Sequence, residues 1–192
     1  VTAMTIGDYP EYLALGFLRN QGMLQSDDQI TDIAFDEELE TIVVRTARTT
    51  DYEAKLQKKT RTSGCAVGTV FGDMMEGLEA VKLPRSDIKT SWLYTLAAKI
   101  NRTPSLYLKA GAIHGTVLCH QDQPLVYMED VGRHNAVDKV AGWMLSQSEK
   151  ADDKILYTTG RLTSEMVIKT AHMGIPILAT LSGFTAWGVE LA

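Results

Sequence analysis

Apolar side chains recur along this chain in two rhythms, one typical of strands and one typical of helices. After residue 110, short apolar runs of strand length alternate with segments whose apolar residues recur at helical spacing. In the segment 135–147, for example, one helical face carries Val137, Val140, Ala141, Met144 and Leu145. Such alternation predicts a parallel or mixed sheet with helical crossovers.

The predicted elements of this part are strands at 113–119, 125–128, 155–158 and 177–181, and helices at 135–147, 164–173 and from 185 onward. Earlier in the chain we expect a helix with Asp8 as its N-cap, and strands at 30–35 and 41–45. Ser86 and Asp87 are expected to cap a further helix, which carries an apolar stripe as far as Ile100.

The segment 46–77 shows neither rhythm, and we interpret it as a mobile loop with Cys65 near its tip. The chain is accordingly divided into N-terminal helix and strands (1–60), a cysteine loop (61–80) and an α/β core (81–192).

Composition narrows the class of protein. The 192 residues are 45% hydrophobic and 22% charged, as in a globular protein with one main core. The net charge of −5 argues against a protein that coats nucleic acid. No apolar run approaches the roughly 20 residues that cross a bilayer, and no signal peptide is visible. Two cysteines are too few for a disulfide framework or a Cys-rich zinc site, so a reducing cytoplasm is expected.

Two strand-to-helix turns, 130–135 and 159–164, contain the same Gly-Arg pair, and the pairs lie 28 residues apart. This distance is about one helix plus one strand, so both turns are expected at the carboxyl edge of the sheet, where open α/β sheets bind ligands. Glycine allows close backbone approach, a helix N-terminus offers free N–H groups, and arginine binds phosphate in a bidentate manner. We predict a phosphorylated, nucleotide-like ligand there, with the turn 182–185 completing the rim. The alternative is that both arginines are surface salt-bridge partners.

The candidate ligand-binding residues are His114, Gly132, Arg133, His134, Asn135, Gly160, Arg161, Ser164 and Ser182. For His114 the sequence leaves two equal alternatives, a side chain in the site or a hydrogen-bonded core histidine.

The two thiols differ in their surroundings. Cys119 closes an apolar run and is expected to be partly buried and inert. Cys65 lies between glycines and follows Lys58, Lys59 and Arg61, cations that would lower a thiol pKa. Cys65 is therefore the candidate nucleophile, and an incidental exposed thiol is the alternative.

Three blocks of sequence resemble one known family. The run 129–139, Glu-Asp-Val-Gly-Arg-His-Asn-Ala-Val-Asp-Lys, is very similar to the signature of the FdhD/NarQ family of formate dehydrogenase accessory sulfurtransferases. The runs 159–167 and 174–178 resemble its second block, and 13–18 followed by Gly22 resembles its N-terminal block. The resemblance covers almost the whole chain.

This resemblance implies both a fold and a function. The implied fold is a cytidine-deaminase-like α/β/α core with a mixed sheet and a smaller N-terminal α+β part. The implied activity is that of a cytoplasmic sulfurtransferase, in which Cys65 accepts a persulfide sulfur from a cysteine desulfurase. The sulfur then passes to the molybdenum cofactor, a bis-molybdopterin guanine dinucleotide, which formate dehydrogenase requires. The Gly-Arg turns would hold the phosphates of this guanine nucleotide-type ligand. A homodimer without structural metal, nucleic acid or membrane partner is implied as well.

Several departures from the family pattern matter. The usual Cys-x-x-Cys loop here has Gly68 in its second place, so Cys65 would act without a second thiol in this loop. The family's Thr-Gly-Gly before the strand histidine is replaced by Ala-Gly-Ala at 110–112, and relatives continue beyond the position of Ala192 into a cofactor-binding segment. A second hypothesis is therefore a non-catalytic chaperone that delivers the molybdenum cofactor to apo formate dehydrogenase. A zinc deaminase is rejected, because its paired metal-binding motifs are missing.

Overall fold

The protein was analysed as a computed structural model, in which residues 1–25, 27–49, 75, 78 and 80–192 are described. The named helices are α1 (Pro10–Asn20), α4 (Thr90–Ile100), α5 (Leu106–Ala110), α6 (Arg133–Gln147), α7 (Ser164–His172) and α8 (Ala186–Leu191). The named strands are β1 (Ile30–Asp36), β2 (Thr41–Thr46), β3 (His114–His120), β4 (Gln123–Asp130), β5 (Lys154–Thr158) and β6 (Ile177–Thr180). No helix in these described ranges is both long and apolar enough to cross a membrane.

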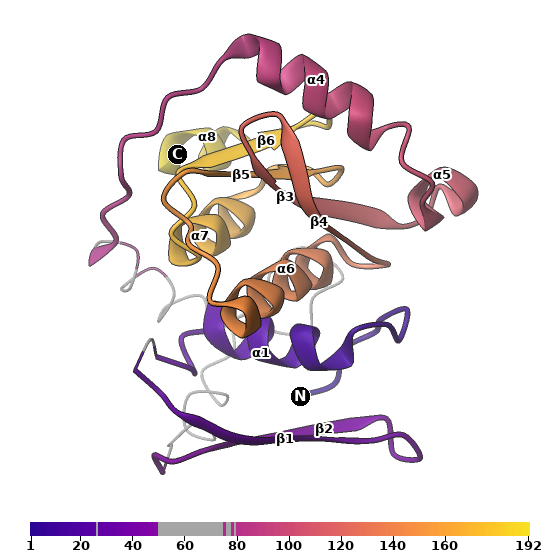
Figure 1. Ribbon diagram of the computed structural model, residues 1–192, viewed down its shortest axis with the longest axis vertical. Helices are drawn as coiled ribbons and strands as arrows, with labels where there is room; N and C mark the ends of the chain where they lie inside the picture. The colour runs from indigo at the N-terminus through magenta and orange to yellow at the C-terminus, as the bar shows by residue number, and fades with distance from the viewer. Residues whose placement is uncertain (26, 50–74, 76–77, 79) are drawn as a thin grey trace.

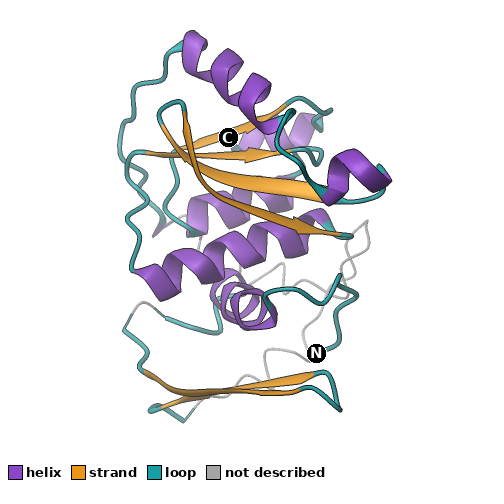
Figure 2. Ribbon diagram, turned by 45° about the vertical axis from the view of Figure 1, so that its right-hand side comes forward, coloured by secondary structure: helices purple, strands orange, loops and turns teal. Residues whose placement is uncertain are grey.

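The main sheet has four strands in the order β4-β3-β5-β6. Strand β3 pairs antiparallel with β4 on one side and with β5 on the other, and β5 pairs parallel with β6. The predicted mixed sheet with helical crossovers is thus confirmed. The separate β1–β2 hairpin lies on the far side of α1 from this sheet (Figures 1 and 2).

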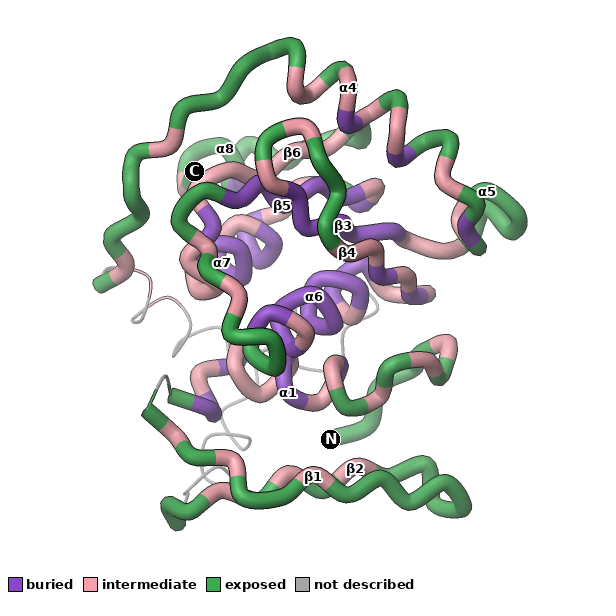
Figure 3. The backbone as a smooth tube through the Cα atoms, viewed as in Figure 1, coloured by how far each residue is buried: buried purple, intermediate pink, exposed green. Residues whose placement is uncertain are grey.

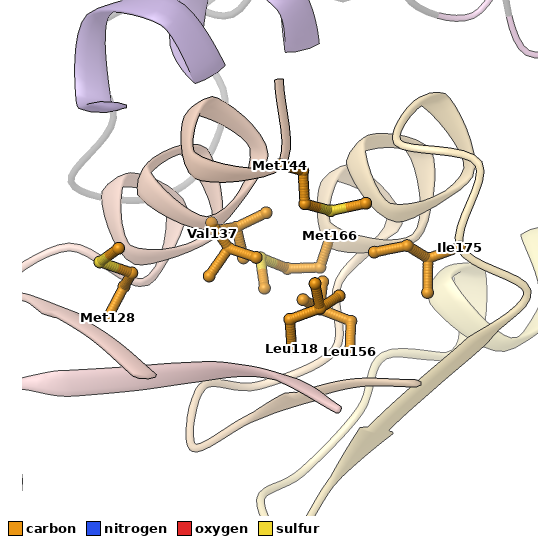
Figure 4. Close-up of a cluster of buried hydrophobic side chains, with 8 residues drawn as sticks. Leu118, Met128, Val137, Met144, Leu156, Met166 and Ile175 are labelled. Carbon is orange, nitrogen blue, oxygen red and sulfur yellow. The ribbon is translucent and has the colours of Figure 1, made fainter. Parts of the chain in front are cut away.

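Alternate residues of the central strands pack against different helices. On one face, Leu118 and Leu156 join a buried cluster with side chains of α6 and α7, including Val137 and Met166 (Figure 4). On the other face, a second cluster sets residues of α4 against the strands; its buried members are Leu96, Ile100, Val117, Cys119, Ile155 and Tyr157. The sheet is therefore covered on both faces, which gives the expected α/β/α core.

Helix α1 forms a further layer against α6 (Figure 1). Two glycines make this contact possible. A Cβ atom on Gly16 would lie 1.7 Å from the Asp138 carbonyl oxygen, and one on Gly142 would lie 1.9 Å from the Tyr12 carbonyl oxygen. The burial pattern follows these layers, because α6 and the central strands are mostly buried while the hairpin is mostly exposed (Figure 3).

Two cap predictions were wrong. Asp8 does not cap α1, whose N-cap is Tyr9 in a left-handed conformation; the Asp8 carboxylate instead pairs with the Lys139 ammonium. Helix α4 begins at Thr90 after Lys89, so Ser86 and Asp87 lie outside it. The short helix α5 was not predicted, because five residues are too few to show a period.

Candidate functional site

Three strand-to-helix connections meet at one edge of the main sheet. They join β4 to α6, β5 to α7 and β6 to α8, and they contain both Gly-Arg pairs. Because β3 runs antiparallel to β4, its first residue His114 pairs with Asp130 at the same edge. The predicted shared edge is therefore confirmed, and we call these three turns with His114 the rim.

Threonine hydroxyls fix the turn that follows β5. The Thr158 hydroxyl accepts a hydrogen bond from the Gly160 amide at 3.1 Å, and the Thr159 hydroxyl accepts one from the Gly115 amide at 3.0 Å. The Thr180 hydroxyl of β6 donates to the Gly160 carbonyl at 2.9 Å. The sequence analysis missed these hydroxyls, although their position at the ends of two strands was a usable signal.

The two Gly-Arg pairs touch each other. A Cβ atom on Gly160 would lie 2.8 Å from Cβ of Arg133, so only glycine allows this side chain to lie across the second turn. Arg133 is buried, whereas Arg161 is exposed. The prediction that both arginines serve one site gains a geometric basis here, since the first pair packs directly on the second.

The third turn is bonded to the second. The Leu162 amide donates to the Gly183 carbonyl at 3.0 Å, and the Thr185 amide donates to the Leu162 carbonyl at 3.0 Å. Ser182 lies beside this bridge and is exposed, and its amide donates to the Thr180 hydroxyl at 2.9 Å. The expectation that this turn completes the rim is confirmed by these bonds.

The two long helices at the rim start without a side-chain cap. Gly132 precedes α6 and Thr163 precedes α7, and neither cap residue gives its helix a side-chain hydrogen bond. By contrast, the Thr185 hydroxyl of the short helix α8 accepts from the Gly188 amide at 3.1 Å. The positive ends of α6 and α7 therefore favour an anion at the rim, and Ser164 forms the buried first turn of α7.

His114 lies within the field of both arginines. Burial lowers the pKa of His114 from its ordinary value of 6.5, and the charges of Arg133 and Arg161 lower it further. Its Nδ1 atom is buried without a hydrogen-bond partner among the described residues. A neutral imidazole has one nitrogen that donates and one that accepts, so His114 can offer a hydrogen bond at the rim.

His134 and Asn135 are engaged within the protein. The His134 Nε2 atom lies 3.2 Å from Glu165 Oε2, and both side chains are only 8% exposed, between α6 and α7. The Asn135 amide donates to Asp130 at 2.9 Å and to the Met4 carbonyl at 2.7 Å. These contacts give the two predicted ligand-binding residues a supporting role in the structure.

Asp130 is the main feature that sequence reasoning missed. Its fully buried carboxylate accepts from the Gly132 amide at 3.1 Å and lies 2.7 Å from the Lys139 ammonium. Burial alone would raise the pKa of Asp130, but hydrogen bonds from three side chains and from this amide hold it below its ordinary value. An aspartate two residues before a glycine amide is a known turn signal and could have been recognised.

Comparison with known proteins was made for the whole chain. A sequence model of the FdhD/NarQ family matches residues 1–192. The chain belongs to this family. The resemblance found in the three sequence blocks is therefore confirmed over the full length of the chain.

Individual FdhD/NarQ relatives agree with this assignment. The chain is 32% identical to the sulfur carrier protein FdhD of Saccharolobus solfataricus, over 98% of this chain and 71% of the relative. It is 26% identical to the protein of the same name from Bacillus pumilus, over 100% of this chain and 74% of the relative. A crystal structure described as a formate dehydrogenase accessory protein from Desulfotalea psychrophila matches with a TM-score of 0.75 and 28% identity, covering 98% of this chain and 70% of that one.

Of the two cysteines of this FdhD/NarQ chain, only Cys119 lies among the described residues. Cys65, the predicted persulfide carrier, lies outside the described residues. Cys119 is fully buried in the α4 face of the sheet, and burial raises its pKa to about 12. The prediction that Cys119 is an inert thiol is consistent with this raised pKa. In the described part of the chain, no group of three or more His, Cys, Asp and Glu side chains is placed to hold a metal ion.

Proposed function

We propose that this protein is a sulfur carrier that serves formate dehydrogenase, with Cys65 as the residue that carries the sulfur. The observation that supports this most is the match of the family model to residues 1–192, together with relatives named sulfur carrier protein. The structural relative described as a formate dehydrogenase accessory protein supports the choice of enzyme.

The proposed first step is a thiol–persulfide exchange. The Cys65 thiolate attacks the terminal sulfur of a persulfide on a cysteine desulfurase, a new S–S bond forms at Cys65, and the desulfurase thiolate leaves. No external oxidant or reductant is needed, because the sulfane sulfur moves between two thiols. The burial of Cys119 and its raised pKa favour Cys65 as the acceptor, since the thiolate is the reactive form.

The proposed acceptor of the sulfur is the molybdenum cofactor, bound at the rim as a substrate. Its guanine nucleotide phosphates would meet the uncapped starts of α6 and α7, with Arg133 and Arg161 as counter-charges. Arg133 packs directly on Gly160, which brings the two Gly-Arg turns together, and His114 supplies a neutral hydrogen-bonding group. The residues present thus fit a phosphorylated ligand.

Mass spectrometry tests the sulfur-carrier role. The protein is incubated with a cysteine desulfurase and L-cysteine, and we expect one added sulfur on the peptide containing Cys65, removable by dithiothreitol. A Cys119→Ala variant should be loaded as wild type is, while Cys65→Ala should not be loaded. Sulfur found only on Cys119, or on neither cysteine, would contradict the proposal.

Titration with GDP tests the rim. Arg133→Ala and Arg161→Ala should each weaken GDP binding about tenfold or more, because each removes a charge-assisted hydrogen bond of roughly 1.5–3 kcal/mol. Arg45→Ala on the exposed hairpin strand β2 is the matched control and should bind as wild type does. Equal affinity in all of these variants would remove the rim as the nucleotide site.

A second candidate function is a cofactor chaperone that works without persulfide chemistry. Gly68 in place of a second loop cysteine favours it. If Cys65→Ala still activates apo formate dehydrogenase in a strain lacking the native protein, the chaperone is correct and the sulfur carrier is wrong.

A further inference from the structure

The N-terminal segment Met4–Asp8 is fastened at three points to the end of β4 and the first turns of α6. The Thr5 hydroxyl donates to Asp130 Oδ2 at 2.6 Å, and the Met4 carbonyl accepts from the Asn135 amide at 2.7 Å. The Asp8 carboxylate pairs with the Lys139 ammonium. These bonds join parts of the chain more than 120 residues apart, with a sequence separation of 125 for Thr5 and Asp130.

The Asp130 carboxylate is the junction between this segment and the rim. It is fully buried and accepts from the Thr5 hydroxyl on one oxygen and from the Gly132 amide on the other. The Gly132 bond sets the backbone immediately before Arg133, which lies across Gly160. The Lys139 ammonium and the Asn135 amide are the other donors to Asp130, so the four donors together occupy both oxygens, and loss of one leaves a buried acceptor position unfilled.

Lys139 completes the junction with no donor left over. Its buried ammonium group contacts Asp8, Asp130 and the Glu129 carbonyl oxygen, the last at 2.9 Å. An ammonium has three N–H donors, and three oxygens accept them here. Lys139 therefore cannot replace the Thr5 hydroxyl without giving up one of its own partners.

We propose that Thr5 is a positioning residue for ligand binding, which acts through Asp130 on the Gly132–Arg133 turn. This inference rests on the proposed function, since it assumes that the rim binds a guanine nucleotide. Thr5 does not touch the ligand. It fills the last acceptor position of the Asp130 carboxylate and so keeps the turn in the conformation that presents Arg133.

The test compares Thr5→Val with Thr5→Ser in the full chain, using GDP as the probe. Valine has the shape of threonine without the hydroxyl, and serine keeps the hydroxyl. We expect Thr5→Val to bind GDP roughly tenfold more weakly, because apparent affinity falls with the fraction of molecules that hold the competent turn. Thr5→Ser should bind within about twofold of wild type, a rescue that a purely steric role would not produce.

A second readout follows the turn itself. In protein labelled with ¹⁵N-glycine, the Gly132 amide should exchange with D₂O faster in Thr5→Val than in wild type and Thr5→Ser. The Gly174 amide, which donates to the Ala171 carbonyl at 2.9 Å beyond the far end of α7, is the internal control for general loosening and should be unchanged. Faster exchange at both amides alike would indicate only a less stable fold and would overturn the inference.

The outcomes separate the two proposals. If wild type binds GDP and Thr5→Val binds it equally well, the positioning role is wrong while the rim stands. If wild type does not bind GDP at all, the nucleotide site itself is wrong, and the positioning role falls with it.

Discussion

At the residue scale, buried histidines make the stability of this protein depend on pH. Burial lowers the pKa of His134 from its ordinary 6.5; the hydrogen bond with Glu165 opposes this shift, while the charges of Lys169 and Arg133 reinforce it. The unfolded chain therefore takes up a proton below about pH 6.5 that the folded chain does not, so stability falls as the pH drops.

We expect the free energy of unfolding to fall by about 1 kcal/mol between pH 7.5 and 5.5 for this one group. Urea unfolding followed by circular dichroism at both values measures it. His134→Gln should reduce the pH dependence without abolishing it, because burial also lowers the pKa of His114. A slope as steep in His134→Gln as in wild type would assign it to other groups.

Residue-scale roles were only partly readable from the sequence. The Gly-Arg pairs and His114 could be chosen because glycine, arginine and histidine suit phosphate binding wherever a turn presents them. His134 and Asn135 carry equally suitable groups, but they face Glu165 and Met4, which lie far away in the sequence. The sequence therefore indicated which side chains could bind phosphate, but not which of them point toward the rim.

At the element scale, two mid-helix glycines set the distance between α1 and α6. Gly16→Ala or Gly142→Ala would be favourable on helix propensity alone, by about 1 kcal/mol. In the structure, however, the added methyl of Gly16→Ala would lie 1.7 Å from the Asp138 carbonyl oxygen, and that of Gly142→Ala would lie 1.9 Å from the Tyr12 carbonyl oxygen. Because both obstacles are backbone atoms, the helices must move apart.

We expect each alanine variant to lower the free energy of unfolding by about 2–3 kcal/mol, as overpacked cores do. The midpoint of urea unfolding at constant m-value measures this loss. Gln147→Ala at the exposed end of α6 is the control and should change stability by less than about 0.5 kcal/mol. An alanine variant as stable as wild type would mean that the helices do not cross this closely.

The elements themselves followed the hydrophobic pattern closely wherever that pattern was regular. Strand β5 was expected at 155–158 and lies at Lys154–Thr158, because a fully buried strand is a continuous apolar run. Helix starts were less well predicted. Asp8 looks like an N-cap in sequence, but a salt bridge with Lys139 outweighs local capping. Gly16 and Gly142 stand out as glycines inside predicted helices, but their role in the close contact of α1 with α6 is visible only once the two helices are placed together.

At the scale of the whole molecule, buried charges link the layers that the sheet and helices form. Asp138 of α6 accepts from the Lys169 ammonium of α7 at 2.8 and 2.7 Å and from the Asn20 amide of α1 at 2.7 Å. Asn20 and Asp138 are separated by 118 residues. No local pattern could have paired them, because the register of three helices decides which polar groups meet.

The strand order shows the same limit of sequence reasoning. Alternating strands and helices predicted a mixed sheet, and in the structure the short 121–122 connection closes a β3–β4 hairpin. Strand β5 pairs with the free edge of β3 and not with the free edge of β4. This choice depends on which edge of the sheet the crossover through helix α6 can reach. The family resemblance supplied the fold directly, and the structural relative with a TM-score of 0.75 agrees with it.

The buried pair Asp138–Lys169 gives the last prediction. Either single change, Asp138→Asn or Lys169→Met, leaves a charge with side-chain exposure of 4% or less without its partner, and breaking buried pairs costs about 3–5 kcal/mol. The double variant Asp138→Asn/Lys169→Met buries no unpaired charge and keeps an oxygen that Asn20 can reach. We expect it to recover about 2 kcal/mol relative to the sum of the singles, measured as a coupling energy by urea unfolding. The pair Arg45–Asp32, in which both side chains are at least half exposed, is the control, with an expected coupling of about 0.5 kcal/mol. Additive effects at Asp138 and Lys169 would show that the layers are held by apolar packing alone and that this ion pair only fills the space between them.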